Sequence, residues 1–223
     1  MKYSGKDLQF LQLLRSCRIL DDVDEHLLDE SLGTVMVSCS DGRRMHDIFT
    51  HKVKMQRFHR PDPKIHTIAV AGGAPRLVKD SPMNEPGHTT DVDLMREIRL
   101  GCQLMETNIV ALYAHGACGM ATMSNMNLLR VFDDLVAAKE RVKLELPGSQ
   151  VACFYHAAYP IEESKRKRFW FGDWVPPVFR KPLFGTGERQ RTYFLSRDRF
   201  EGMRELLLDE VGEQEGERIV LAA

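Results

Sequence analysis

Three side chains in this sequence have the chemistry of zinc ligands. Cys39 follows a run of strand-forming residues at 34–38, and His115 and Cys118 follow a second such run at 108–114. If both runs are strands of one sheet, two soft thiolates and one imidazole can meet at the same end of it. A structural zinc site normally has a fourth Cys or His. Three ligands with an acid and a base close by therefore predict a catalytic zinc site.

Asp41 and Arg43 are that acid and base, in the string Cys-Ser-Asp-Gly-Arg that begins at Cys39. Asp41 could itself be a fourth ligand and close the site. If Arg43 holds it by a charge-assisted hydrogen bond, Asp41 can instead accept a hydrogen bond from a zinc-bound water or hydroxide and orient it. Zinc lowers the pKa of that water from about 15.7 towards 7, which makes a nucleophile at neutral pH. The competing interpretation is a helix-capping Asp with an ordinary surface salt bridge.

Other uses of the cysteines are less consistent with the sequence. A Cys at a strand-to-helix junction can be a nucleophile, as in tyrosine phosphatases, where an Arg six positions later closes a phosphate-binding loop. Here Met45 occupies that position, Arg44 lies one residue too early, and Asp41 would repel phosphate. The remaining alternative is a core histidine with two inert core thiols.

Strands and helices alternate around these residues. This βαβαβ order predicts an α/β fold with a central, mostly parallel sheet of four or five strands flanked by helices. Ligands of such sheets bind beyond the carboxyl ends of the strands, where Cys39, the Gly72-Gly73 pair and His115 fall. The expected strands span 34–38, 66–71, 108–114, 150–156 and 191–195, and the expected helices span 8–15, 24–32, 44–58, 90–105, 125–142 and 196–210.

The composition indicates an ordinary water-soluble domain. The 223 residues are 43% hydrophobic and 28% charged, with a formal net charge of -1, which gives no reason to expect a nucleic acid or a membrane as partner. Five scattered cysteines suit a reducing, cytoplasmic location, and no signal peptide or membrane-spanning run is apparent. We expect residues 1–168 to form the zinc-binding domain, including an N-terminal helical segment, and residues 169–223 to be an extension packed on it. The basic and aromatic stretch at 165–174 is interpreted as a helix end packed on the core and not as an RNA-binding site.

The two motifs together resemble the signature of the β-class carbonic anhydrases. The pattern C-x-D-x-R follows one strand, H-x-x-C-G follows a later one, and the order of elements agrees from about Leu8 to Tyr159. The resemblance implies zinc held by Cys39, His115 and Cys118, with Asp41 and Arg43 as the catalytic dyad. It also implies reversible hydration of CO₂ to bicarbonate, a parallel sheet, and a homodimer or higher homo-oligomer. In this family the same Asp can also ligate zinc in a closed, inactive state.

The chain departs from that family in the loop that borders the pocket. The second strand normally ends in Arg-Asn-Ala-Gly, whereas residues 70–75 here read Val-Ala-Gly-Gly-Ala-Pro, and the interval between the two motifs is longer. Gly72, Gly73 and Gly119 are expected to line the substrate pocket. Two alternatives remain open: hydrolysis of carbonyl sulfide or carbon disulfide at the same zinc site, and a non-catalytic zinc protein with Asp41 on the metal. Candidate proton carriers are His46, His66, His88 and His156.

Overall fold

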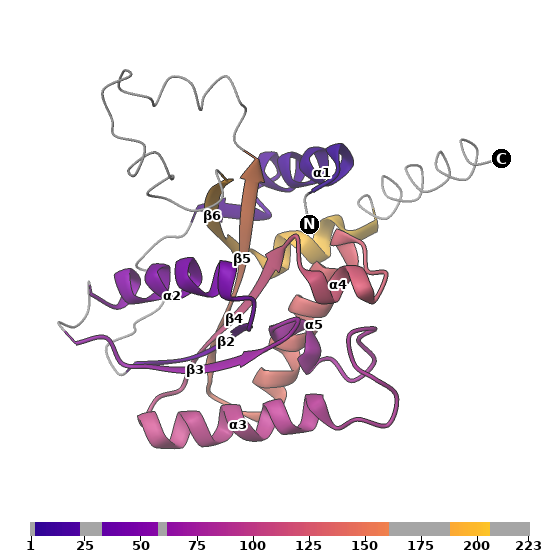
Figure 1. The fold of residues 1–223 in the computed structure, drawn as a ribbon. Helices are drawn as coiled ribbons and strands as arrows, with labels where there is room; N and C mark the ends of the chain where they lie inside the picture. Colours follow the sequence, from indigo (N-terminus) through magenta and orange to yellow (C-terminus); the bar gives the residue numbers. More distant parts are fainter. Residues whose placement is uncertain (1–2, 23–32, 58–61, 161–187, 206–223) are drawn as a thin grey trace, which may run out of the picture.

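A six-stranded mixed sheet forms the centre of the molecule (Figure 1). This computed structural model describes residues 3–22, 33–57, 62–160 and 188–205. The strand order is β1-β6-β5-β4-β2-β3. The four parallel strands are β2 (Thr34–Cys39), β3 (Ile65–Val70), β4 (Ile109–Gly116) and β5 (Gln150–Pro160). The antiparallel strands β6 (Glu188–Leu195) and β1 (Leu20–Asp22) extend the sheet beyond β5.

Helices cover both faces of this sheet, because successive residues of a strand point to opposite sides. On one face, Val35 and Val37 of β2 pack in the larger hydrophobic core. On the other face, Met36 packs in a smaller core to which helix α2 contributes Ile48 and Met55. The helices are α1 (Gly5–Ser16), α2 (Gly42–Arg57), the short 3₁₀ helix η1 (Ala74–Leu77), α3 (Thr90–Met105), α4 (Gly119–Met123), α5 (Leu128–Glu145) and a helix over residues 197–205.

The expected α/β fold with a mostly parallel sheet is confirmed. The expected number of four or five strands is wrong, because the short strand β1 adds a sixth. Its three residues, Leu20, Asp21 and Asp22, have no strand-like alternation and pair with β6 from far along the chain. Helix α4 was also not expected. The expected helix at 24–32 and the basic and aromatic stretch at 165–174 lie outside the described residues, and the division at residue 168 stays a prediction.

The register brings the two motifs to the same edge of the sheet. Val37 of β2 lies opposite Leu112 of β4, and both strands run in the same direction. Cys39 ends β2 two residues later, and His115 lies three residues beyond Leu112, as the second-last residue of β4. The carboxyl edge of a parallel sheet is where α/β proteins bind their ligands. None of the helices in the described ranges is long and apolar enough to cross a membrane.

Candidate metal centre

Cys39, His115 and Cys118 form one compact group of ligand atoms. Their sulfur and ring nitrogen atoms all lie within 4.8 Å of one another. Three different local structures position them: Cys39 is the last residue of β2, His115 is in the final part of β4, and Cys118 is the residue that precedes α4. All three are buried, with 4%, 3% and 6% of their surface exposed. The predicted group of three ligands is therefore brought together in the folded chain.

The donor set fits a zinc ion. Both ring nitrogens of His115 are buried, and neither has a hydrogen-bond partner among the described residues. A buried polar atom is normally paired, so a ligand that accepts the imidazole lone pair would remove this cost. Two thiolates and a neutral imidazole suit zinc in ligand type, and the two negative charges balance the charge of the ion. These residues therefore have the chemistry and the position to hold zinc.

Backbone N–H groups support both sulfur atoms. The Gly72 N–H donates a hydrogen bond to Cys39 Sγ at 3.3 Å, and the Asp41 N–H also points at this sulfur. The N–H groups of Met120 and Ala121, at the start of α4, donate to Cys118. Such donors favour the negatively charged thiolate over the thiol. The loop after β3 and the first turn of α4 thus prepare the two sulfurs to bind a cation.

The contact between the two sulfurs shifts the pKa values of Cys39 and Cys118 in opposite directions. The hydrogen bond from Cys118 lowers the pKa of Cys39 to about 4, and the contacts with His115 and the Asp41 N–H act in the same direction against burial. The same hydrogen bond, together with burial, raises the pKa of Cys118. Of the two thiols, Cys39 is therefore the more readily ionised. Binding of a metal by both sulfurs requires both to be thiolates, so it releases protons.

Asp41 is held by Arg43 at both carboxylate oxygens. Arg43 Nε donates to Oδ1 at 3.0 Å and Nη2 to Oδ2 at 2.7 Å. The Arg43 backbone N–H also donates to Oδ1 at 3.0 Å, which caps the start of α2. The Arg43 side chain lowers the pKa of Asp41 to about 2. The paired hydrogen bond expected between these residues is present, and so is the capping contact of the competing interpretation.

Gly72 and Gly73 pack tightly against the first ligand. Their φ angles are +92° and +72°, which favour glycine over residues with a side chain. A Cβ atom on Gly73 would lie 2.9 Å from Cys39 N, and one on Gly72 would lie 2.7 Å from Met83 Sδ. Gly119, by contrast, has open space within 4 Å of its Cβ position. The role of the three glycines as a pocket lining stays a prediction.

Two tyrosines beside the ligands were not predicted from the sequence. The hydroxyl groups of Tyr3 and Tyr155 lie 3.0 Å apart, and both occupy the space where Gly116 would carry a Cβ atom. Gly116 directly follows the ligand His115, so these phenols pack against the backbone between the second and third ligands. Tyr155 lies in the run of buried residues of β5, but its contact with residue 3 depends on the folded chain.

The histidines named as proton carriers lie in different environments. His156 is the neighbour of His115 across the β4–β5 pair. It is only 2% exposed, and its Nδ1 lies 3.0 Å from Thr192 Oγ1. His46 and His88 are exposed on the surface. His66, in β3, is half-buried. His156 is thus the candidate that pairs with His115 in the sheet, and it is shielded from solvent.

Comparison of the chain with protein-family models found no match, and comparisons with curated proteins and with solved structures found none either. The fold and the site therefore define a broad class of protein and not a particular family. The protein has an α/β fold with a mostly parallel sheet and a buried Cys-His-Cys group that could hold a metal ion.

Proposed function

We propose that this protein is a zinc enzyme of the carbonic anhydrase type, which hydrates CO₂ reversibly to bicarbonate. The observation that carries the proposal is the convergence of Cys39, His115 and Cys118 at the carboxyl edge of the sheet. The Asp41–Arg43 pair adjoins this group through the short turn after Cys39. The resemblance of the two motifs to the β-class carbonic anhydrases supplies the reaction.

The residues of the chain would divide the chemistry between them. Zinc, when bound, supplies Lewis acidity that lowers the pKa of a water from about 15.7 to about 7. Asp41, with a pKa of about 2, is ionised at neutral pH and can only accept hydrogen bonds. It would accept one from the attacking water and so direct an oxygen lone pair at the carbon of CO₂. Arg43 would keep the carboxylate in position for this contact.

The alternative of a non-catalytic zinc protein requires Asp41 to be a ligand. The two hydrogen bonds from the Arg43 guanidinium occupy both of its carboxylate oxygens. A bidentate, charge-assisted pair of this kind is among the stronger hydrogen-bonded arrangements in proteins. This geometry favours a site that Asp41 leaves open.

Stopped-flow CO₂ hydration between pH 6 and 9 tests the proposal, using protein loaded with one equivalent of zinc. We expect activity that the Asp41→Asn change lowers by about 10²-fold or more, because the neutral amide is a weaker acceptor than the carboxylate and replaces one acceptor oxygen with an NH₂ donor. Asp47→Asn, which alters another acid near the start of α2 whose partner is His46, is the matched control and should retain full activity. Hydrolysis of carbonyl sulfide or carbon disulfide without CO₂ hydration would assign the site to that reaction. Zinc-loaded protein that is inactive on all three would favour the non-catalytic alternative.

The resemblance also leads us to propose a homodimer or higher homo-oligomer. Sedimentation of the purified protein at micromolar concentration tests this. A monomer would contradict it.

A further inference from the structure

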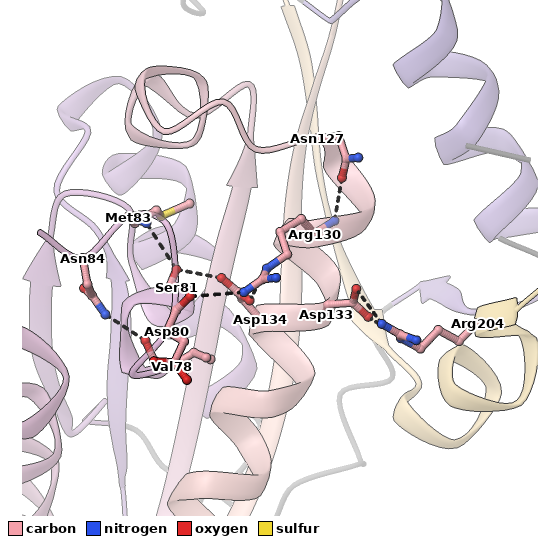
Figure 2. Close-up of polar contacts among 10 residues, drawn as sticks. All are labelled: Val78, Asp80, Ser81, Met83, Asn84, Asn127, Arg130, Asp133, Asp134 and Arg204. Atoms are coloured by element: carbon pink, nitrogen blue, oxygen red, sulfur yellow. Dashed lines mark hydrogen bonds and ion pairs between the residues drawn. The ribbon is translucent and has the colours of Figure 1, made fainter. Parts of the chain in front are cut away.

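Asp134 on α5 is a buried carboxylate that the proposed chemistry does not use. Only 2% of the residue is exposed. Ser81 Oγ donates to its Oδ2 at 2.6 Å, and Arg130 Nε donates to its Oδ1 at 2.8 Å (Figure 2). Burial raises the pKa of Asp134, against the lowering effect of these two partners. Burying a carboxylate is unfavourable unless it is paired. Asp134 therefore requires both hydrogen bonds, and they hold Ser81 and Arg130 in place.

Those partners hold the long loop between η1 and α3. Ser81, itself 3% exposed, belongs to this loop and lies 53 positions from Asp134. Arg130 also donates from Nη2 to the carbonyl oxygen of Asp80 at 3.3 Å. One turn of α5 therefore binds two successive residues of the loop, one through its side chain and the other through its backbone.

Inside the loop, further contacts connect Ser81 with Met83, and Met83 with the residues beside the metal centre. The Met83 N–H lies 3.4 Å from Ser81 Oγ, and Asn84 Nδ2 donates to the carbonyl oxygen of Val78 at 2.8 Å (Figure 2). The Met83 side chain is 1% exposed, and its sulfur fills the space where Gly72 would carry a Cβ atom. Met83 thus packs directly against Gly72.

Gly72 is the residue whose N–H donates to the Cys39 sulfur, at 3.3 Å. The turn that contains it is closed by the Gly73 N–H, which donates to the carbonyl oxygen of Val70 at 2.9 Å, and Met83 packs against Gly72 from the side of the loop. The contacts therefore form one continuous path from Asp134 through Ser81 and Met83 to Gly72. Groups that hydrogen-bond a metal ligand tune how it binds the ion.

We propose that Asp134 is a positioning residue for the metal centre: through Ser81 and Met83 it keeps the Gly72 N–H on the Cys39 thiolate. This inference rests on the proposed function only in that Cys39 must bind a metal. Asp134 lies on α5, which contributes none of the three ligands, so it would affect metal binding only through the residues between them. Loss of the N–H contact would leave a more electron-rich sulfur and a less well-oriented ligand.

The neighbouring acid provides a matched control. Asp133 lies on the same turn of α5 but points away from the loop, towards Arg204, whose Nε donates to it at 2.9 Å (Figure 2). Asp133→Leu and Asp134→Leu remove equivalent groups from adjacent positions of one helix. Only the second removes an anchor of the loop. Ser81→Ala, which deletes a single oxygen atom, tests the same path with a smaller change.

The experiment measures zinc affinity by competition with a chelator and the absorption spectrum of the Co²⁺-loaded full chain. For Asp134→Leu and Ser81→Ala we expect zinc affinity to fall by about 10- to 100-fold. We also expect the sulfur-to-Co²⁺ charge-transfer band to move to longer wavelength, since the sulfur loses a hydrogen bond. A merely structural role would lower thermal stability but leave this band in place.

Asp133→Leu should match the unsubstituted protein in both measurements. Folded Asp134→Leu and Ser81→Ala proteins with unchanged zinc affinity and an unchanged band would overturn the inference, while leaving the metal centre intact. Failure of the unsubstituted protein to bind either ion would instead overturn the proposed function, and this inference with it.

Discussion

The guanidinium of Arg43 binds both carboxylate oxygens of Asp41, although the two side chains differ greatly in exposure. Asp41 is 16% exposed and Arg43 is 59% exposed, and the Nη2–Oδ2 distance is 2.7 Å. Arg43 therefore holds, from its exposed position, an acid that lies two residues after Cys39 in the chain. An exposed salt bridge contributes little to stability, so its main consequence is the orientation and charge of Asp41.

Replacing Arg43 with Leu should release Asp41. The pKa of the carboxyl group should rise from about 2 towards its ordinary value of 3.8. The free carboxylate can then approach the metal, so we expect CO₂ hydration at neutral pH to fall by at least about tenfold. Arg96→Leu, which removes an exposed Arg that pairs with Asp93 and Glu97 on α3, should leave the rate unchanged. Equal activity of both variants would show that Arg43 does not control Asp41.

The ligand cysteines should differ sharply from the other thiols. Cys39→Ser and Cys118→Ser should each reduce bound zinc from one equivalent to near zero after dialysis, because each removes one of three ligands. Cys102→Ser, which alters a partly exposed thiol on α3, should retain full zinc content. Zinc should also raise the melting temperature of the unsubstituted protein and not that of Cys39→Ser, since a ligand stabilises only the state that binds it. Retention of zinc by either ligand variant would remove that residue from the site.

Gly73→Ala should damage the metal centre as well as the fold. Its φ is +72°, and a Cβ atom would lie 2.8 Å from the carbonyl oxygen of Tyr113 and 2.9 Å from Cys39 N. Gly148→Ala is a matched control, because its φ is +85° and nothing lies within 4 Å of the Cβ position.

We expect Gly148→Ala to cost about 1–2 kcal/mol of unfolding free energy through its backbone conformation alone. Gly73→Ala should cost more in urea unfolding and should also weaken zinc binding. If the two variants lose equal stability and bind zinc equally well, close packing at Gly73 is unimportant.

His51 should make the fold less stable in mild acid. Burial lowers its pKa to about 4 from 6.5, with further lowering by the charges of Lys52, His156 and Lys54. The unfolded chain therefore binds a proton at this site between pH 6.5 and 4 that the folded chain does not. Stability should fall as the pH falls through this interval, by at most about 3 kcal/mol. His51→Gln should show a smaller loss in urea unfolding at pH 4.5 relative to pH 7. An identical pH dependence in both proteins would place the charge change elsewhere.

The meeting of Cys39, His115 and Cys118 was predictable because Cys and His are distinctive donors that here follow two clear strand signals. The parallel sheet was predictable for a related reason, since residues 34–38 and 108–114 are apolar runs of strand length. Strand β1 was not, because its three residues become a strand only by pairing with β6. The path of contacts from Asp134 to Gly72 could not be predicted from the sequence either. Ser81 and Asp134 lie 53 positions apart, and nothing in the spacing of a Ser and an Asp indicates that they meet.

The proposed function depends most directly on the claim that Cys39, His115 and Cys118 bind a zinc ion. X-ray absorption at the zinc edge of the purified full chain, with its zinc content measured, tests it. We expect one zinc per chain, with two sulfur atoms at about 2.3 Å and one imidazole nitrogen at about 2.0–2.1 Å. A chain that binds no zinc, or whose zinc has a shell without sulfur or with four sulfurs, would contradict the account.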